Sequence, residues 1–205
     1  MVVSVSTMQK IVGQIAESDR KFAPIITRAP LCDLGRSKSN QSHFESLVSS
    51  VISQQLATAA ARTINARFKE QVKQVSPKQV QKIDDLILRQ VGLSAAKTKT
   101  IKGLASAALN GEIDFEKLDQ EEDAIVYQKL TALWGIGPWT VDMFMMFKLG
   151  RLDIWPTGDL GVRRGWEKIH NAKVEITPNE LLKKGEKFQP HRSVVAWYCW
   201  RALDN

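Results

Sequence analysis

Apolar side chains recur along this chain at the spacing of one helix face. Phe44, Leu47, Val48, Val51 and Ile52 follow the i, i+3, i+4, i+7, i+8 pattern, which is typical of an amphipathic helix. Residues 57–68 continue with alanine-rich helix formers. Further helices are expected at about 6–18, 84–90, 95–109, 121–133, 138–148, 160–169, 178–186 and 191–203. Because no segment alternates convincingly between apolar and polar residues, the sequence predicts an all-α fold.

Glycine and proline interrupt this pattern, and the segment LWGIGPWT at 133–140 is the most informative interruption. Ile125 and Leu133 stand at near-helical spacing before it, and Pro138 occupies the first position of a following helix, where its missing N–H is not needed. Two glycines permit a tight turn with bare amide groups, and a helix N-terminus favours an anion. The segment predicts a helix, a hairpin turn and a helix that together bind a DNA phosphate. An ordinary helix-helix turn is the alternative.

A second loop, WPTGDLGVRRG at 155–165, carries one carboxylate to the expected start of a helix. At that position, unpaired amide groups and the helix dipole favour a charged side chain. We therefore expect Asp159 to be ionised. It is either a helix N-cap alone or a carboxylate with a chemical role.

Length and charge limit the number of domains and the kind of partner that the chain could have. The chain has 205 residues and 23.0 kDa, which suits one domain or two small lobes with a real core. Its formal net charge of +7 and isoelectric point near 9.5 suit a polyanionic partner, although surface lysines that serve solubility give the same balance.

Cysteine and histidine usage argues against a metal site and a disulfide framework. Cys32 and Cys199 lie far apart in the sequence, which favours free thiols in a reducing compartment. The three histidines show no metal-site spacing, so we expect no metal. The N-terminus has no signal peptide pattern, and no stretch has the length needed to span a bilayer. We expect a soluble monomer in a bacterial cytoplasm or a eukaryotic nucleus, without membrane association.

Several segments together resemble the helix-hairpin-helix (HhH-GPD) DNA glycosylase superfamily, in its 3-methyladenine DNA glycosylase II branch. They are VISQQLAT at 51–58, VGLSAAK at 91–97, the hairpin, the loop of Asp159, and PHRSVVAWYCWRAL at 190–203. The resemblance implies a single glycosylase domain over 1–205. It implies a central helical lobe at 36–150 with the hairpin at 133–140, a second lobe from 1–35 and 151–205, and an active-site cleft between them.

The resemblance implies hydrolysis of the N-glycosidic bond of alkylated purines, of the 3-methyladenine and 7-methylguanine type, extruded from double-stranded DNA. Asp159 would stabilise the oxocarbenium-like sugar and orient or deprotonate water. An alkylated purine already carries positive charge, so one carboxylate suffices without a general acid. Relatives that also cut the strand carry a lysine where Trp139 stands. Tryptophan cannot form a Schiff base, so a monofunctional enzyme is expected.

The resemblance also implies a base-binding pocket. Trp139 would stack on the extruded base and Trp200 matches another pocket aromatic, with Trp155 and Trp134 as further candidates. Core packing is the alternative for each tryptophan. Met143 stands where the bacterial enzyme of the family has an aromatic residue, which softens the expected pocket wall.

DNA contacts are expected at the hairpin and at two other segments. The hairpin residues are Gly135, Ile136, Gly137 and Thr140. Gln55 is the expected wedge that fills the gap left by the base, with Leu56 as the alternative. Lys97, followed by Lys99 and Lys102, would hold another phosphate. The alternatives are two solvated glutamines and exposed lysines.

Two other functions fit the same segments. One is a catalytically idle protein that binds damaged DNA, and the other is a glycosylase for oxidised or mismatched bases. Asp159 argues against the first, while Trp139 and the loop of Asp159 favour alkylated bases over the second. No cofactor is expected, and a monovalent cation would bind the hairpin carbonyls only once DNA is bound.

Overall fold

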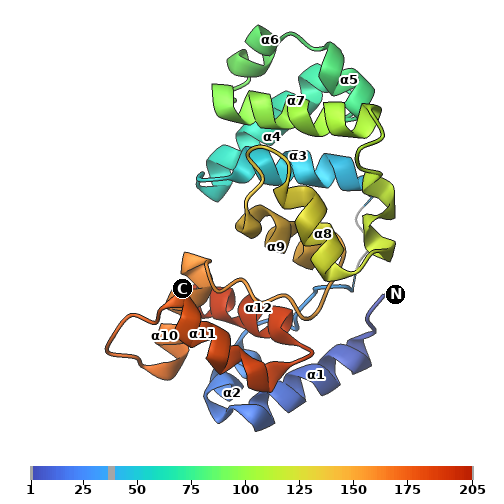
Figure 1. Ribbon diagram of the computed structural model, residues 1–205. Coiled ribbons are helices and arrows are strands. Elements are labelled where there is room, and N and C mark those ends of the chain that lie inside the picture. The colour runs from blue at the N-terminus through green and yellow to red at the C-terminus, as the bar shows by residue number, and fades with distance from the viewer. Residues whose placement is uncertain (1, 37–39, 205) are drawn as a thin grey trace. The chain divides into compact units, whose positions relative to one another are not determined.

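The computed structural model describes residues 2–36 and 40–204, and all regular secondary structure in these ranges is helical (Figure 1). The predicted all-α fold is confirmed. The elements are α1 (Val5–Ser18), η1 (Arg20–Phe22), α2 (Ala23–Arg28), α3 (His43–Ser53), α4 (Thr58–Val72), α5 (Pro77–Lys82), α6 (Asp85–Gln90), α7 (Ala95–Leu109), η2 (Phe115–Gln120), α8 (Asp123–Thr131), α9 (Pro138–Phe147), α10 (Leu160–His170), α11 (Pro178–Gly185), η3 (Glu186–Phe188) and α12 (Arg192–Leu203).

The described residues form two compact units. Residues 40–144 make the central unit, and residues 2–36 with 145–204 make the terminal unit. The division falls inside α9, so the last turn of this helix belongs to the terminal unit. The expected lobe boundary after residue 35 adjoins residues 37–39, which lie outside the described residues.

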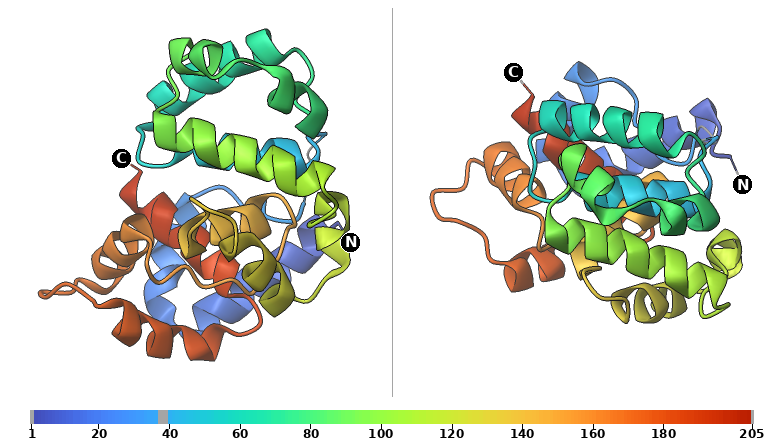
Figure 2. Two further views of the ribbon diagram at one scale, coloured as in Figure 1. Left: turned by 45° about the horizontal axis from the view of Figure 1, so that its top comes forward. Right: turned by 90° about the horizontal axis from the view of Figure 1, so that it is seen from above.

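The central unit is built on α3 and α7, which lie side by side (Figures 1 and 2). The predicted apolar stripe of α3, from Phe44 to Ile52, is buried throughout. The side chains of Ser42 and Ser94 accept hydrogen bonds from backbone amides in the first turns of α3 and α7. Such caps satisfy amide groups that have no partner within the helix and so fix where each helix begins.

The terminal unit is organised around α10 and α12. Residues 193–199 of α12 are all buried, so this helix is covered on every side. A Cβ atom at Gly165 would lie 1.9 Å from the carbonyl oxygen of Cys199, which shows that the two helix backbones approach closely there. Only glycine fits this crossing.

A cluster of aromatic and ion-paired side chains lies at the C-terminal end of α10. The ring of His170 stacks on Trp166 at 4.0 Å, and its Nε2 lies 3.0 Å from Asp19. Lys187 donates to the same carboxylate at 2.9 Å. Although burial acts to raise it, these hydrogen bonds lower the pKa of Asp19 to about 2.

Most predicted helices are present, and the differences have local causes. The helix expected at 95–109 has these bounds, whereas the one expected at 121–133 spans Asp123–Thr131 because the hairpin turn begins earlier. Short helices show little periodicity, and the six-residue helices α2 and α5 were not predicted, although the equally short α6 was expected at 84–90. Among the described residues, no helix combines the length and apolar character that a membrane crossing requires.

Candidate functional site

The hairpin of the central unit has the predicted turn between two helices. Gly135 has φ +82°, and a Cβ atom there would lie 2.1 Å from Oγ1 of Thr100 on α7, so both conformation and space require glycine. Ile136 is buried and its amide donates to the Leu133 carbonyl at 3.1 Å. Gly137 is exposed, and a Cβ atom added there would meet no heavy atom within 4 Å. The turn is thus anchored by Ile136 and presents its backbone at Gly137.

Thr140, expected to contact DNA, has its hydroxyl group inside the protein. Its side chain is 2% exposed, and Oγ1 accepts a hydrogen bond of 2.8 Å from the side-chain amide of Gln54. The same amide donates to the Gly135 carbonyl at 3.2 Å. The Thr140 hydroxyl therefore connects the hairpin to the end of α3.

The expected wedge lies in the loop between α3 and α4. Gln55 is exposed and has φ +55°, a left-handed conformation that is uncommon for a residue with a side chain. Leu56 is also exposed, as an apolar side chain must be to enter DNA. The alternative of two solvated glutamines fits Gln55 but not Gln54, whose side chain is bonded to the hairpin.

Two lysines of α7, which were expected to contact phosphate, bind carbonyl groups at the ends of other helices. The Lys97 ammonium donates to the carbonyls of Ile52 at 2.8 Å and Gln54 at 2.7 Å, and burial lowers its pKa. Its ammonium is thus directed at the end of α3, because the last carbonyls of a helix have no partner within the helix and attract cations. Lys102 makes the corresponding contacts with the carbonyls of Gln81, in the last turn of α5, and of Ile83, which caps it.

Trp139 and Met143 lie one turn apart on α9. Trp139 is 37% exposed and Met143 is partly exposed, in a helix that is otherwise mostly apolar and buried. Trp134, in the hairpin, is 54% exposed, with the Lys99 ammonium 4.2 Å from its ring centroid. These exposures leave both tryptophan rings partly available to a ligand.

Asp159 lies in the terminal unit and caps α10, as predicted. Its Oδ1 accepts a hydrogen bond of 2.8 Å from the Val162 amide. The indole Nε1 of Trp200 donates to the same oxygen at 2.9 Å. A Cβ atom at Gly161 would lie 2.8 Å from this indole ring, so the glycine makes room for the pair. The carboxylate is therefore held by two donors from two helices, one more than an N-cap requires.

Phe147 was not singled out from the sequence. Its ring stacks on Trp200, with centroids 5.7 Å apart and an angle of 30° between the planes, and 53% of the residue is exposed. Phe147 ends α9 and belongs to the terminal unit. The sequence contained no local signal for it, because the two rings are 53 positions apart.

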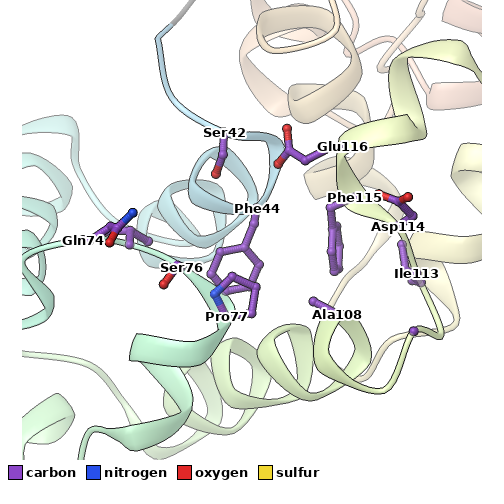
Figure 3. A pocket seen from close by; sticks show the side chains of 12 residues that line it. Ser42, Phe44, Gln74, Ser76, Pro77, Ala108, Ile113, Asp114, Phe115 and Glu116 are labelled. Carbon is purple, nitrogen blue, oxygen red and sulfur yellow. The ribbon is translucent and has the colours of Figure 1, made fainter.

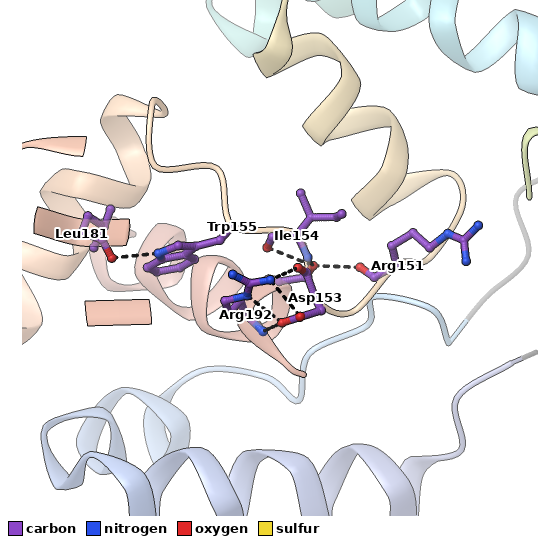
Figure 4. Close-up of polar contacts among 7 residues, drawn as sticks. Arg151, Asp153, Ile154, Trp155, Leu181 and Arg192 are labelled. Carbon is purple, nitrogen blue, oxygen red and sulfur yellow. Dashed lines mark hydrogen bonds and ion pairs between the residues drawn. The ribbon is translucent and has the colours of Figure 1, made fainter. Parts of the chain in front are cut away.

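Trp155, a candidate base contact, is buried in the terminal unit. Its Nε1 donates to the Leu181 carbonyl at 2.9 Å, and its ring packs against Gly185 (Figure 4). The core-packing alternative describes this residue. Asp153 and Arg192 form a paired contact in the same region, with Arg192 Nε 2.8 Å from Oδ1 and Nη2 2.9 Å from Oδ2. This two-point ion pair fixes the start of α12 against the segment that leads to Asp159.

Other groups lie apart from these residues. A pocket of about 620 Å³ lies in the central unit at the first turn of α3 and the end of α7, lined by Phe44, Ile113 and Phe115 among others (Figure 3). None of the predicted site residues lines it.

Burial raises the pKa of the Cys32 thiol to about 12 and also raises that of Cys199. No group of three metal-ligating side chains occurs within residues 2–36 and 40–204.

Comparison with known proteins places this geometry in a family. The model of the HhH-GPD superfamily of base excision DNA repair proteins matches residues 48–191. DNA-3-methyladenine glycosylase 1 of Schizosaccharomyces pombe is 35% identical over 173 residues, which cover 81% of this chain and 75% of that protein.

Two solved structures have the same fold. One is the Schizosaccharomyces pombe 3-methyladenine DNA glycosylase in complex with abasic DNA, with a TM-score of 0.83 and 31% identity over 91% of this chain and 94% of that one. The other is a DNA-3-methyladenine glycosidase of Bacillus halodurans, with a TM-score of 0.80 and 34% identity over 94% and 88% of the two chains. The chain belongs to the HhH-GPD superfamily of base excision DNA repair proteins.

Proposed function

We propose that this protein is a monofunctional DNA glycosylase that releases alkylated purines, of the 3-methyladenine and 7-methylguanine type, from double-stranded DNA. The observation that carries the proposal is the single carboxylate of Asp159, held at a helix start by Val162 and Trp200. Relatives named for the release of 3-methyladenine support the choice of substrate.

Asp159 has the chemistry that this reaction needs. As the glycosidic bond breaks, the sugar gains positive charge, and a fixed carboxylate stabilises that charge without having to reorganise. The same group orients or deprotonates the attacking water. The leaving purine carries a positive charge from its alkyl group and departs neutral, so the reaction does not require a second carboxylate as general acid.

Aromatic side chains supply the base contacts in this proposal. Trp139 and Trp200 are the candidate stacking residues, and Phe147 extends the Trp200 surface. The electron-rich face of a tryptophan attracts a cationic purine. Met143 contributes a flexible, polarisable contact beside Trp139. Gln55 or Leu56 fills the gap in the duplex.

We also propose that the protein does not cleave the DNA strand. Relatives that also cut the strand use a lysine amine that forms a Schiff base with the sugar. Trp139 stands at the position of that lysine here. The product is therefore an intact strand with an abasic site. We further propose that the protein acts as an intracellular monomer without a resident cofactor, and that a monovalent cation joins the hairpin only in the DNA complex.

Base release from methylated duplex DNA, measured by chromatography, tests the proposal. Wild type is expected to release 3-methyladenine or 7-methylguanine and Asp159→Asn is not, while the strand stays intact until heated in alkali. Asp204→Asn is the matched control, because Asp204 is an exposed carboxylate paired with Arg201 after the last helix. No release of any methylated base by wild type contradicts the proposal. If wild type binds lesions as well as Asp159→Asn does and never cleaves, the protein is a damage-binding protein in which Asp159 only caps α10.

A further inference from the structure

The loop of residues 54–57, here called the wedge loop, is held by side-chain contacts with other elements of the central unit. α3 ends at Ser53, and Gln55 then takes φ +55° before α4 begins at Thr58. A residue with a Cβ atom adopts this conformation only when its surroundings impose it. Backbone contacts inside the loop are few, with the Leu56 amide donating to the Ser53 carbonyl at 3.3 Å. The constraint must therefore come from other elements.

Lys97 supplies the first constraint. It reaches from the first turn of α7 to the carbonyls of Ile52 and Gln54, at 2.8 and 2.7 Å. These carbonyls stand on either side of the point where α3 ends. An ammonium that binds both fixes the direction in which the chain leaves the helix. It does so immediately before Gln55.

Gln54 supplies the second constraint. Its side-chain amide donates to the carbonyl of Gly135 at 3.2 Å and to Oγ1 of Thr140 at 2.8 Å. Gly135 is the turn residue of the hairpin, and Thr140 lies in the first turn of α9. One amide group therefore joins the wedge loop to both sides of the phosphate-binding turn.

We propose that Gln54 and Lys97 are positioning residues that hold the wedge loop and the hairpin as one preformed DNA-binding element, with Lys97 directed at the loop rather than at a phosphate. The inference rests on the proposed function, in which Gln55 or Leu56 enters the duplex while the hairpin binds its backbone. A wedge that is already ordered loses less conformational entropy when DNA binds, so its insertion is favoured. Loss of either positioning residue weakens binding without removing any group that touches DNA.

The salt dependence of binding separates a positioning lysine from a phosphate contact. The probe is a duplex with one tetrahydrofuran abasic site, and affinity is measured at several salt concentrations. For Lys97→Met we expect an affinity roughly tenfold lower at fixed salt, as for one lost charge-assisted hydrogen bond, with an unchanged slope of log affinity against log salt. A slope smaller in magnitude by about 0.9 would show that Lys97 neutralises a phosphate and would overturn its assignment.

Hydrogen exchange in the DNA-free protein tests the connection made by Gln54. Gln54→Ala is expected to accelerate exchange of the Leu56 and Thr140 amides more than it accelerates exchange of the α12 amides in the terminal unit. Gln71→Ala, which changes an exposed glutamine on α4, is the matched control and should leave these amides unaffected. Exchange in Gln54→Ala that equals the wild-type exchange overturns the proposal.

A double-mutant cycle checks that the contact with Thr140 is responsible. Thr140→Val removes the acceptor at constant shape, whereas Thr140→Ser keeps it. Thr140→Val should weaken binding by no more than Gln54→Ala, which also loses the bond to Gly135. The double variant should be no weaker than Gln54→Ala, and Thr140→Ser should retain wild-type affinity. Fully additive losses overturn the connection. None of these measurements requires base release, so a wild type that releases no base while the exchange and binding results hold refutes the proposed function alone.

Discussion

Gly135 gives the sharpest stability prediction, because two independent effects oppose any side chain there. Its φ of +82° costs an L-residue about 1–2 kcal/mol. A Cβ atom would also lie 2.1 Å from Oγ1 and 3.0 Å from Cγ2 of Thr100, which is buried and donates to the Ala96 carbonyl. Forcing such a packed side chain aside typically costs about 1–3 kcal/mol. Gly135→Ala should therefore lower the free energy of unfolding by about 2–5 kcal/mol.

Urea unfolding at one pH and temperature measures this loss. Gly137→Ala is the matched control two residues away, because Gly137 is exposed, does not have a positive φ and has no heavy atom near a Cβ position. It should change the free energy of unfolding by less than about 1 kcal/mol. The difference between the two losses of unfolding free energy excludes any effect that an alanine would have anywhere in this turn.

A second variant separates the two effects at Gly135. Thr100→Ala removes Oγ1 and Cγ2 and leaves the Thr100 Cβ at 3.1 Å, which needs a shift of only a few tenths of an ångström. Gly135→Ala made in that background should therefore retain mainly the conformational cost of about 1–2 kcal/mol. If Gly135→Ala is no more destabilising than Gly137→Ala, neither the strain nor the close contact operates. The account of the hairpin would then be refuted.

Three further predictions follow from other contacts. Trp200→Phe keeps an aromatic ring but removes the indole N–H that donates to Asp159, so single-turnover base release should slow about tenfold; an unchanged rate would contradict the role of this bond. Because the folded pKa of Asp19 is about 2, below its usual 3.8, its contribution to stability is present above about pH 4 and is lost as the pH falls toward 2. Asp19→Asn should cost about 1 kcal/mol at pH 6, after allowance for solvent screening, and much less at pH 2.5, and a pH-independent difference in urea midpoints would refute this. Cys32 and Cys199 are fully buried with raised pKa values, so a disulfide reagent should modify neither until denaturant unfolds the chain; rapid modification of the native protein would show that the thiols are accessible.

The spacing of apolar and capping residues within single helices was sufficient to predict much of the fold and part of the candidate site. The stripe from Phe44 to Ile52 defined α3, because burial repeats along one helix face. The N-cap role of Asp159 followed from its place between a glycine and an apolar helix start. Both depend on residues within one or two turns of each other, where sequence and structure correspond directly.

Contacts between distant segments could not be predicted in this way. Lys97 was expected to contact phosphate because a helix start with basic side chains can hold an anion, with an exposed lysine as the alternative, yet its partners are carbonyls 43 and 45 positions earlier. Gln54 joins the hairpin 81 positions later. Either side chain could have pointed into solvent, as Gln55 does. The choice is made by tertiary packing, which one sequence does not display.

The close crossing of α10 and α12 at Gly165 has a consequence for how the proposed base contacts can diversify. Because the backbone at Gly165 abuts the backbone at Cys199, the spacing of the two helices does not depend on the size of neighbouring side chains. α10 begins at Asp159, and Trp200 follows Cys199 on α12. The crossing therefore fixes Asp159 and Trp200 relative to each other. Substitutions of the surrounding aromatic side chains would not change this arrangement. Under the proposed function, lesion preference can change at positions such as Phe147 while the geometry of the proposed catalytic carboxylate is retained.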